Sequence, residues 1–210
     1  FKPTNRGMKI AYLVLAVLII AVALGACTLL QRTESNSSNT STVDVAKNNS
    51  NATPRINPFN DLRNRALTAS PEQFEVDQKT SAPMVYGVVM DWNLGTGTAT
   101  FVSFISGDAS MYTSTGGGVI GGIGHENVRT ASIQFVKNAQ KFVPKAHRSD
   151  DLSLPDSNRV KFFFLTTKGR FVAEEQLTKF DDGSSRWLEL FDDANKVITE
   201  FRTVSGDFGE

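Results

Sequence analysis

The chain has 210 residues, of which 40% are hydrophobic, with 22 basic and 22 acidic side chains and a single cysteine. This composition excludes a wholly disordered chain, a disulfide-stapled secreted domain and a strongly basic nucleic-acid-binding protein. The zero net charge is a sum over three unlike regions. Residues 1–32 hold four basic and no acidic side chains, residues 33–56 hold two of each, and residues 57–210 hold 16 basic and 20 acidic.

The first region, residues 1–32, contains an uncharged apolar run from Ile10 to Leu30. As a helix rising about 1.5 Å per residue, this run is long enough to cross the roughly 30 Å hydrocarbon core of a bilayer. Three basic residues precede it and only Arg32 directly follows it, so the positive-inside rule places the N-terminus in the cytoplasm. The sequence therefore predicts a membrane segment that leaves the rest of the chain on the extracytoplasmic side.

The end of the same run allows a second interpretation. From Met8, the apolar stretch leads to Leu24-Gly25-Ala26-Cys27, which resembles the lipobox of a bacterial lipoprotein signal peptide. The resemblance implies cleavage before Cys27 and lipidation of its thiol. The alternative is an uncleaved membrane anchor in which Cys27 is a small apolar residue in lipid. Both interpretations predict a domain tethered to a membrane of the bacterial cell envelope.

The second region, residues 33–56, has the composition of a flexible linker. Between Thr33 and Thr53, 14 of 21 residues are Ser, Thr or Asn. Such a segment cannot bury enough apolar surface to offset the entropy lost on ordering. We expect residues 57–210 to form one folded domain.

Hydrophobic periodicity in residues 57–210 predicts eight elements in the order α-β-β-β-α-β-β-α. They are a helix from Asn57 to Leu67, strands over Met84–Trp92, Thr98–Ser106 and Ala109–Thr113, a helix over His125–Val143 ended by Pro144, strands over Arg159–Thr166 and Arg170–Glu175, and a helix over Trp187–Phe201. This order predicts an α+β fold with an antiparallel sheet of about five strands and two or three helices. It resembles the profilin-like, roadblock and longin class of folds. The glycine-rich stretch Ser110–Glu126, with Tyr86–Asp91 before it and His125–Arg129 after it, is similar to a group of small bacterial domains without established activity, and the similarity runs from about Asn57 to about Arg202.

A glycine-rich turn precedes the second predicted helix. The candidate ligand-binding residues there are Gly116, Gly117, Gly118, Gly121, Gly122, Gly124 and His125. Exposed N–H groups at a helix N-terminus can bind an anion or a phosphate. In the alternative, these glycines allow a tight crossover while Val119, Ile120 and Ile123 fill the core.

The sequence contains no recognisable catalytic constellation. His125 and Glu126 are adjacent on a helix and point about 100° apart, so they cannot act as a pair, and a capping role is favoured. The two histidines do not suggest a metal site, and no cofactor motif is complete. We therefore expect a non-enzymatic module that binds a protein partner or a second copy of itself, without nucleic acid. The alternative is a small-ligand or phosphate-binding domain, possibly an enzyme, that uses the turn at residues 116–124.

Overall fold

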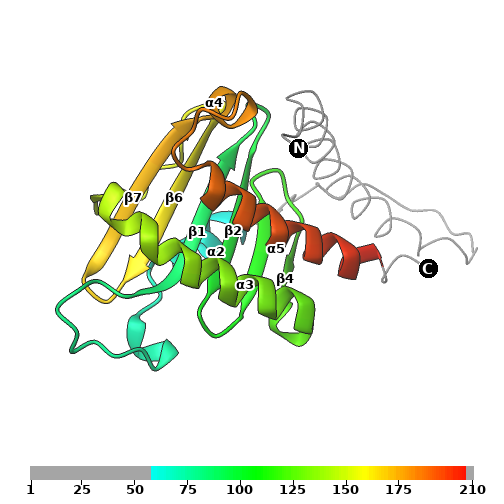
Figure 1. Ribbon diagram of the computed structural model, residues 1–210. Helices are drawn as coiled ribbons and strands as arrows, with labels where there is room; N and C mark the ends of the chain where they lie inside the picture. The colour runs from blue at the N-terminus through cyan, green and yellow to red at the C-terminus, as the bar shows by residue number, and fades with distance from the viewer. Residues whose placement is uncertain (1–57, 207–210) are drawn as a thin grey trace, which may run out of the picture.

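The computed structural model describes residues 58–206, which form a single antiparallel sheet with helices on both faces (Figure 1). The seven strands lie in the order β4-β3-β2-β1-β6-β7-β5. The strands are β1 (Val85–Asn93), β2 (Thr98–Phe104), β3 (Ala109–Thr113), β4 (Gly118–Ile120), β5 (His147–Arg148), β6 (Arg159–Thr166) and β7 (Gly169–Gln176). The helices are α2 (Pro58–Leu67), α3 (Glu126–Ala139), α4 (Leu177–Asp181) and α5 (Leu188–Gly206), with 3₁₀ turns η1 (Pro71–Phe74), η2 (Gly122–Gly124) and η3 (Gln140–Lys145).

The predicted membrane segment, Cys27 and the linker lie outside the described residues. Among residues 58–206, no helix has the length and apolar character needed to cross a membrane.

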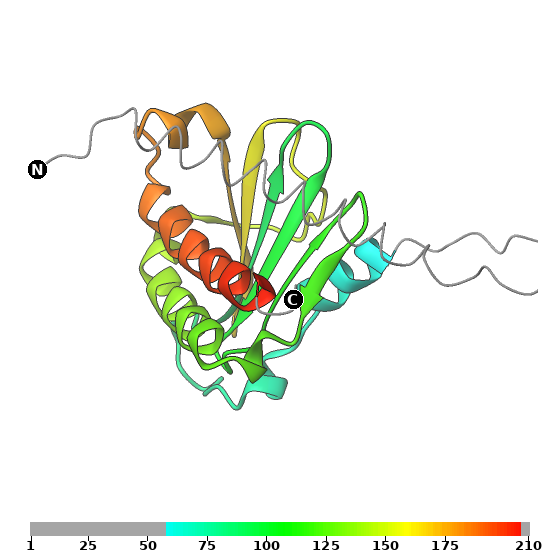
Figure 2. The ribbon, with the colours of Figure 1, turned by 90° about the vertical axis from the view of Figure 1, so that its right-hand side faces the viewer.

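Helices α3 and α5 cover one face of the sheet, side by side, as Figures 1 and 2 both show. Between them and the strands lies the larger core, in which the Trp92 and Phe191 rings meet edge to face at 5.2 Å. The apolar stripe predicted for the last helix is confirmed, since Leu190 and Phe191 near its start and Phe201 near its end are all buried. At the N-terminal end of this helix, the Ser185 hydroxyl accepts the N–H of Trp187.

The opposite face of the sheet is covered by α2 and η1 (Figure 2). Phe59 and Leu67 of α2 are buried against this face. Phe74 of η1 stacks on Phe104 of β2 at 4.5 Å and on Tyr86 of β1 at 5.4 Å. The sheet is therefore buried on both sides, which explains why β1 reads as a nearly continuous apolar run.

The α+β class is confirmed, but the prediction of about five strands is wrong because two short strands were missed. The described residues also form four α-helices rather than two or three, because the five-residue helix α4 was not predicted. The strand β4 has three residues between glycines and had been assigned to the turn, while β5 has only two residues. The predicted helix over His125–Val143 also differs. Its α-helical part ends at Ala139, and residues 140–145 continue as a 3₁₀ turn because the ring of Pro144 is incompatible with an α-helical bond to Gln140.

The prediction that Ile120 and Ile123 fill the core is also wrong. Ile120 is 65% exposed and Ile123 is 49% exposed. Only Val119 of the three contacts the larger core, because its side chain points to the α3 and α5 face while Ile120 points to the other.

Candidate functional site

A row of polar side chains crosses the sheet beneath α2. The register aligns Tyr112 of β3 with Thr100 of β2, Thr100 with Asp91 of β1, and Asp91 with Lys161 of β6. Neighbouring rows on this face are largely apolar, as with Val102, which lies two residues after Thr100. A buried polar row of this kind must satisfy its hydrogen bonds within the protein.

Asp91, which is fully buried, is the centre of this row. Its Oδ2 accepts two hydrogen bonds from the Arg63 guanidinium of α2, at 2.9 Å from Nε and 2.6 Å from Nη2. Its Oδ1 accepts the hydroxyl of Thr100 at 2.6 Å. The two bonds from Arg63 hold α2 over β1, and the bond from Thr100 joins β2 to the same carboxylate.

Lys161 is held in a second set of contacts on the same row. Its ammonium donates to Asp151 Oδ2 at 3.1 Å and to the carbonyl of Ser153 at 3.0 Å. Hydrogen bonds from Ser153 and from this ammonium hold the pKa of Asp151 well below its ordinary value. The Lys161 and Arg63 cations each lie over the Phe163 ring, at 5.3 Å and 5.4 Å from its centroid. One aromatic ring therefore supports both buried cations.

Tyr112 on β3 is the last member of this polar row toward the β4 edge of the sheet. Its hydroxyl is buried and has no hydrogen-bond partner among the described residues. Burial raises the pKa of Tyr112 far above its ordinary value, and the negative charge of Asp91 adds to the effect. The Tyr112 ring meets Phe59 of α2 edge to face, with centroids 6.0 Å apart.

Two cavities lie between α2 and the edge of the sheet formed by β3 and β4, and we call them together the edge groove. They share Leu62, Tyr112 and Ile120. The smaller, of about 210 Å³, lies below the N-terminal half of α2, and the larger, of about 690 Å³, extends below its C-terminal half to η1. The larger cavity also has two charged residues in its walls, Arg65 and Asp108.

The structure separates the glycines that the sequence grouped together. Gly116, Gly117 and Gly118 line the smaller cavity of the edge groove. Gly122 is buried on the other face of the sheet, where an added Cβ would lie 2.7 Å from Val128. Gly121 and Gly124 line neither cavity of the edge groove, and an added Cβ at either would meet no atom within 4 Å.

Three N–H groups of the turn are already used by its own backbone. The N–H groups of Gly116, Gly124 and His125 donate to backbone carbonyls of Thr113, Gly121 and Gly122. His125 occupies the N-cap position of α3 without a side-chain cap hydrogen bond, and Glu126 pairs with Arg129 at 3.9 Å, as the i, i+3 spacing allows.

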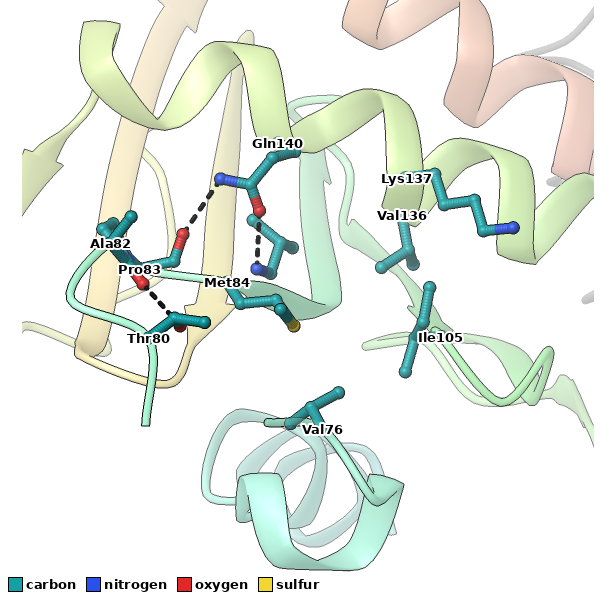
Figure 3. A pocket seen from close by; sticks show the side chains of 10 residues that line it. Val76, Thr80, Ala82, Pro83, Met84, Ile105, Val136, Lys137 and Gln140 are labelled. Atoms are coloured by element: carbon teal, nitrogen blue, oxygen red, sulfur yellow. Dashed lines mark hydrogen bonds between the residues drawn. The ribbon is translucent and has the colours of Figure 1, made fainter. Parts of the chain in front are cut away.

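A further pocket of about 420 Å³ lies between the segment that precedes β1 and the end of α3 (Figure 3). Its lining is mostly apolar and includes Val76, Met84 and Ile105. Gln140 closes one side, because its amide accepts the N–H of Val85 at 2.9 Å and donates to the carbonyl of Pro83 at 2.9 Å. In Figure 3 the Lys137 amine points away from this pocket, so no charge is directed into it.

Sequence reasoning missed Leu62, Tyr112 and Asp108 as parts of a surface site. One feature of the sequence could have predicted the buried polar row. Asp91 is an acidic residue between Met90 and Trp92 in an otherwise apolar strand, and such a residue indicates a buried cation opposite it. Among residues 58–206, no group of three or more His, Cys, Asp or Glu side chains could hold a metal ion. No protein-family model, curated protein or solved structure matches the chain.

Proposed function

We propose that the chain is a membrane-tethered, extracytoplasmic protein-binding module that takes up an extended segment of a partner protein along β4. The observation that carries the proposal is the position of Ile120, a large apolar side chain that is 65% exposed on an edge strand between two cavities. Covering an apolar side chain in this position removes it from water, and fully burying it contributes about 1.5–3 kcal/mol of binding free energy.

The backbone of β4 supports strand addition. Thr113 N–H donates to the carbonyl of Gly117, and hydrogen-bonded pairs alternate along an antiparallel ladder. The backbone groups of Gly118 and Ile120 therefore face outward, at the end of the sheet where no further described strand pairs. Those outward groups can pair with an extended peptide, while its alternate side chains enter the edge groove.

The shortness of β4 favours selective pairing with one kind of segment over pairing with any exposed strand. Three residues flanked by Gly117 and Gly121 offer few ladder bonds, and short edge strands limit edge-to-edge aggregation. Affinity would then depend on side chains that fit the two cavities. The alternative function, phosphate or small-ligand binding by the turn at residues 116–124, has less support because three of the N–H groups there are already used.

The experiment places a photo-crosslinking amino acid at Thr68, an exposed residue that lines the larger cavity of the edge groove, in the full-length chain in its native membrane. We expect an adduct with an extended segment of one partner, mapped by mass spectrometry. The Ile120→Lys variant should lower the adduct about tenfold, the factor for the loss of roughly 1.4 kcal/mol. Leu154→Lys is the matched control, because Leu154 is 40% exposed and lies outside the edge groove. Equal adducts from both variants would reject the proposal.

The tether is tested separately. We propose that residues 1–32 attach the domain to the membrane, and the mass of the mature N-terminus distinguishes the two modes. A chain that begins at Cys27 and carries a diacylglyceryl group supports the lipoprotein, whereas an intact chain with an unmodified thiol supports the uncleaved anchor. A mature chain that lacks residues 1–32 and any lipid would contradict both modes of tethering.

A further inference from the structure

We infer that the partner segment taken up by the edge groove carries a basic side chain that enters the larger cavity and pairs with Asp108. This inference rests on the proposed function and specifies the chemistry of its partner.

The larger cavity lies where the pairing of β4 with β3 ends. Asp108, Ser110 and Tyr112 alternate onto the α2 face at the start of and along β3. The register places Gly118 opposite Tyr112 and Ile120 opposite Ser110. Beyond Ile120 the chain leaves the sheet, so no residue of β4 stands opposite Asp108.

The direction in which the chain leaves keeps this space open. Gly121 adopts a left-handed conformation, with φ +87°, and redirects the backbone. The next residue, Gly122, lies against Val128 and Phe201 in the core on the other face. The space on the α2 face is therefore bounded by Asp108, Ile120 and α2, and the described chain does not fill it.

Asp108 has the properties of an incomplete ion pair. Its carboxyl group is partly buried in the cavity wall and forms no ion pair with any described residue, although the Ala109 N–H donates to it. Burial raises the pKa of Asp108, because the carboxylate loses water without gaining a cation. Arg65 on the same cavity is exposed and forms no ion pair with this carboxylate.

A long basic side chain can reach Asp108 from outside β4. A strand added to the sheet would lie about 4.7–4.9 Å beyond β4 and about twice that distance from β3. Past the end of β4, the flexible stem of a lysine crosses the first of these spacings, and the Asp108 side chain, which lines the cavity, extends into the second. Its methylene groups would pass Ile120 and Leu62, which are apolar, and its ammonium would meet the carboxylate. A charge-assisted hydrogen bond in this partly dry site would favour a basic residue over a neutral one of similar size.

The test uses defined peptides and the full-length chain in phosphatidylcholine nanodiscs. The probe is a fluorescent nine-residue peptide in which Thr alternates with Val, Val, Lys and Lys, and its comparison peptide has Gln in place of Lys. We expect the lysine peptide to bind about tenfold more tightly in fluorescence polarisation. In Asp108→Asn the two peptides should bind equally, whereas in Asp156→Asn, which removes an exposed charge outside the edge groove, the preference should persist.

Two control measurements concern the stability of Asp108→Asn and the peptide preference of Arg65→Gln. Asp108→Asn removes a poorly solvated charge, so its thermal stability at pH 7 should match or exceed that of the native chain. Arg65→Gln should preserve or increase the preference for lysine. A preference that survives in Asp108→Asn would overturn this inference while leaving the proposed function intact. The proposed function requires that at least one peptide binds and that Ile120→Lys abolishes this binding. If neither peptide meets this requirement, the proposed function itself fails.

Discussion

Arg63 and Asp91, 28 residues apart in the sequence, form a buried ion pair that joins α2 to the central strand of the sheet, with Nη2 and Oδ2 2.6 Å apart. The contact lies directly behind the edge groove, since α2 also supplies Leu62, the next residue to Arg63, to both cavities. The position of the groove wall therefore depends on a charge pair that is almost completely shielded from solvent.

Asp91→Ala should destabilise the protein by about 3–5 kcal/mol, because it leaves the Arg63 guanidinium buried without a counterion. Urea denaturation followed by circular dichroism measures the change. Glu126→Ala is the control. It breaks an ion pair exposed to solvent, so its effect should stay below about 0.5 kcal/mol. Similar losses in both variants would show that the buried pair does not hold α2.

Sequence periodicity predicted the sheet better than the surface that the sheet presents. The bounds of β3 and β6 agree with the predicted strands over Ala109–Thr113 and Arg159–Thr166, because alternating or continuous apolar residues there end at turn-forming residues. The strand β4 was missed because its three residues lie in a glycine-rich stretch whose composition indicates a turn.

Ile120 shows why the groove itself could not be predicted. An isoleucine near a helix start is usually buried, and its exposure here depends on Gly121, which turns the chain away from the α2 face. The roles of Leu62 and Asp108 depend equally on contacts across the fold. Local propensity carries no information about such long-range arrangements.

The contacts of Asp151 should make the stability of the protein depend on pH. Hydrogen bonds from Ser153 and Lys161 keep the pKa of Asp151 below the unfolded value of 3.8, so the unfolded state binds more protons at acidic pH. The stabilisation is complete above about pH 5 and is lost progressively as the pH falls toward the folded-state pKa. Between pH 5 and pH 2.5, Asp151→Asn should therefore lose less stability in urea titrations than the native chain. Equal losses would show that the contact is not formed in solution.

The two ends of η2 should respond differently to an added methyl group. At Gly122 a Cβ would lie 2.7 Å from Val128 and 2.9 Å from Phe201, so Gly122→Ala should destabilise the protein by about 1–3 kcal/mol through overpacking between α3 and α5. At Gly124 a Cβ would meet nothing within 4 Å and the backbone is not left-handed. Gly124→Ala should be neutral or stabilise by up to about 1 kcal/mol. Thermal denaturation of both variants tests this contrast, which a flexible turn at residues 122–124 would abolish.

Replacing Gln140 should accelerate amide exchange locally rather than across the whole fold. Its amide holds the segment before β1 against α3 through Val85 and Pro83, as Figure 3 shows. Gln140→Ala leaves the Val85 N–H without its acceptor at the edge of an apolar pocket, so amide exchange at Val85 should accelerate by about tenfold, as expected for the loss of roughly 1.4 kcal/mol. Gln134→Ala is the control, since the Gln134 amide donates only to Asn138 on the exposed side of α3. If hydrogen exchange resolved by NMR rises equally across the whole sheet in Gln140→Ala, the amide stabilises the global fold and does not act as a local clasp on this segment.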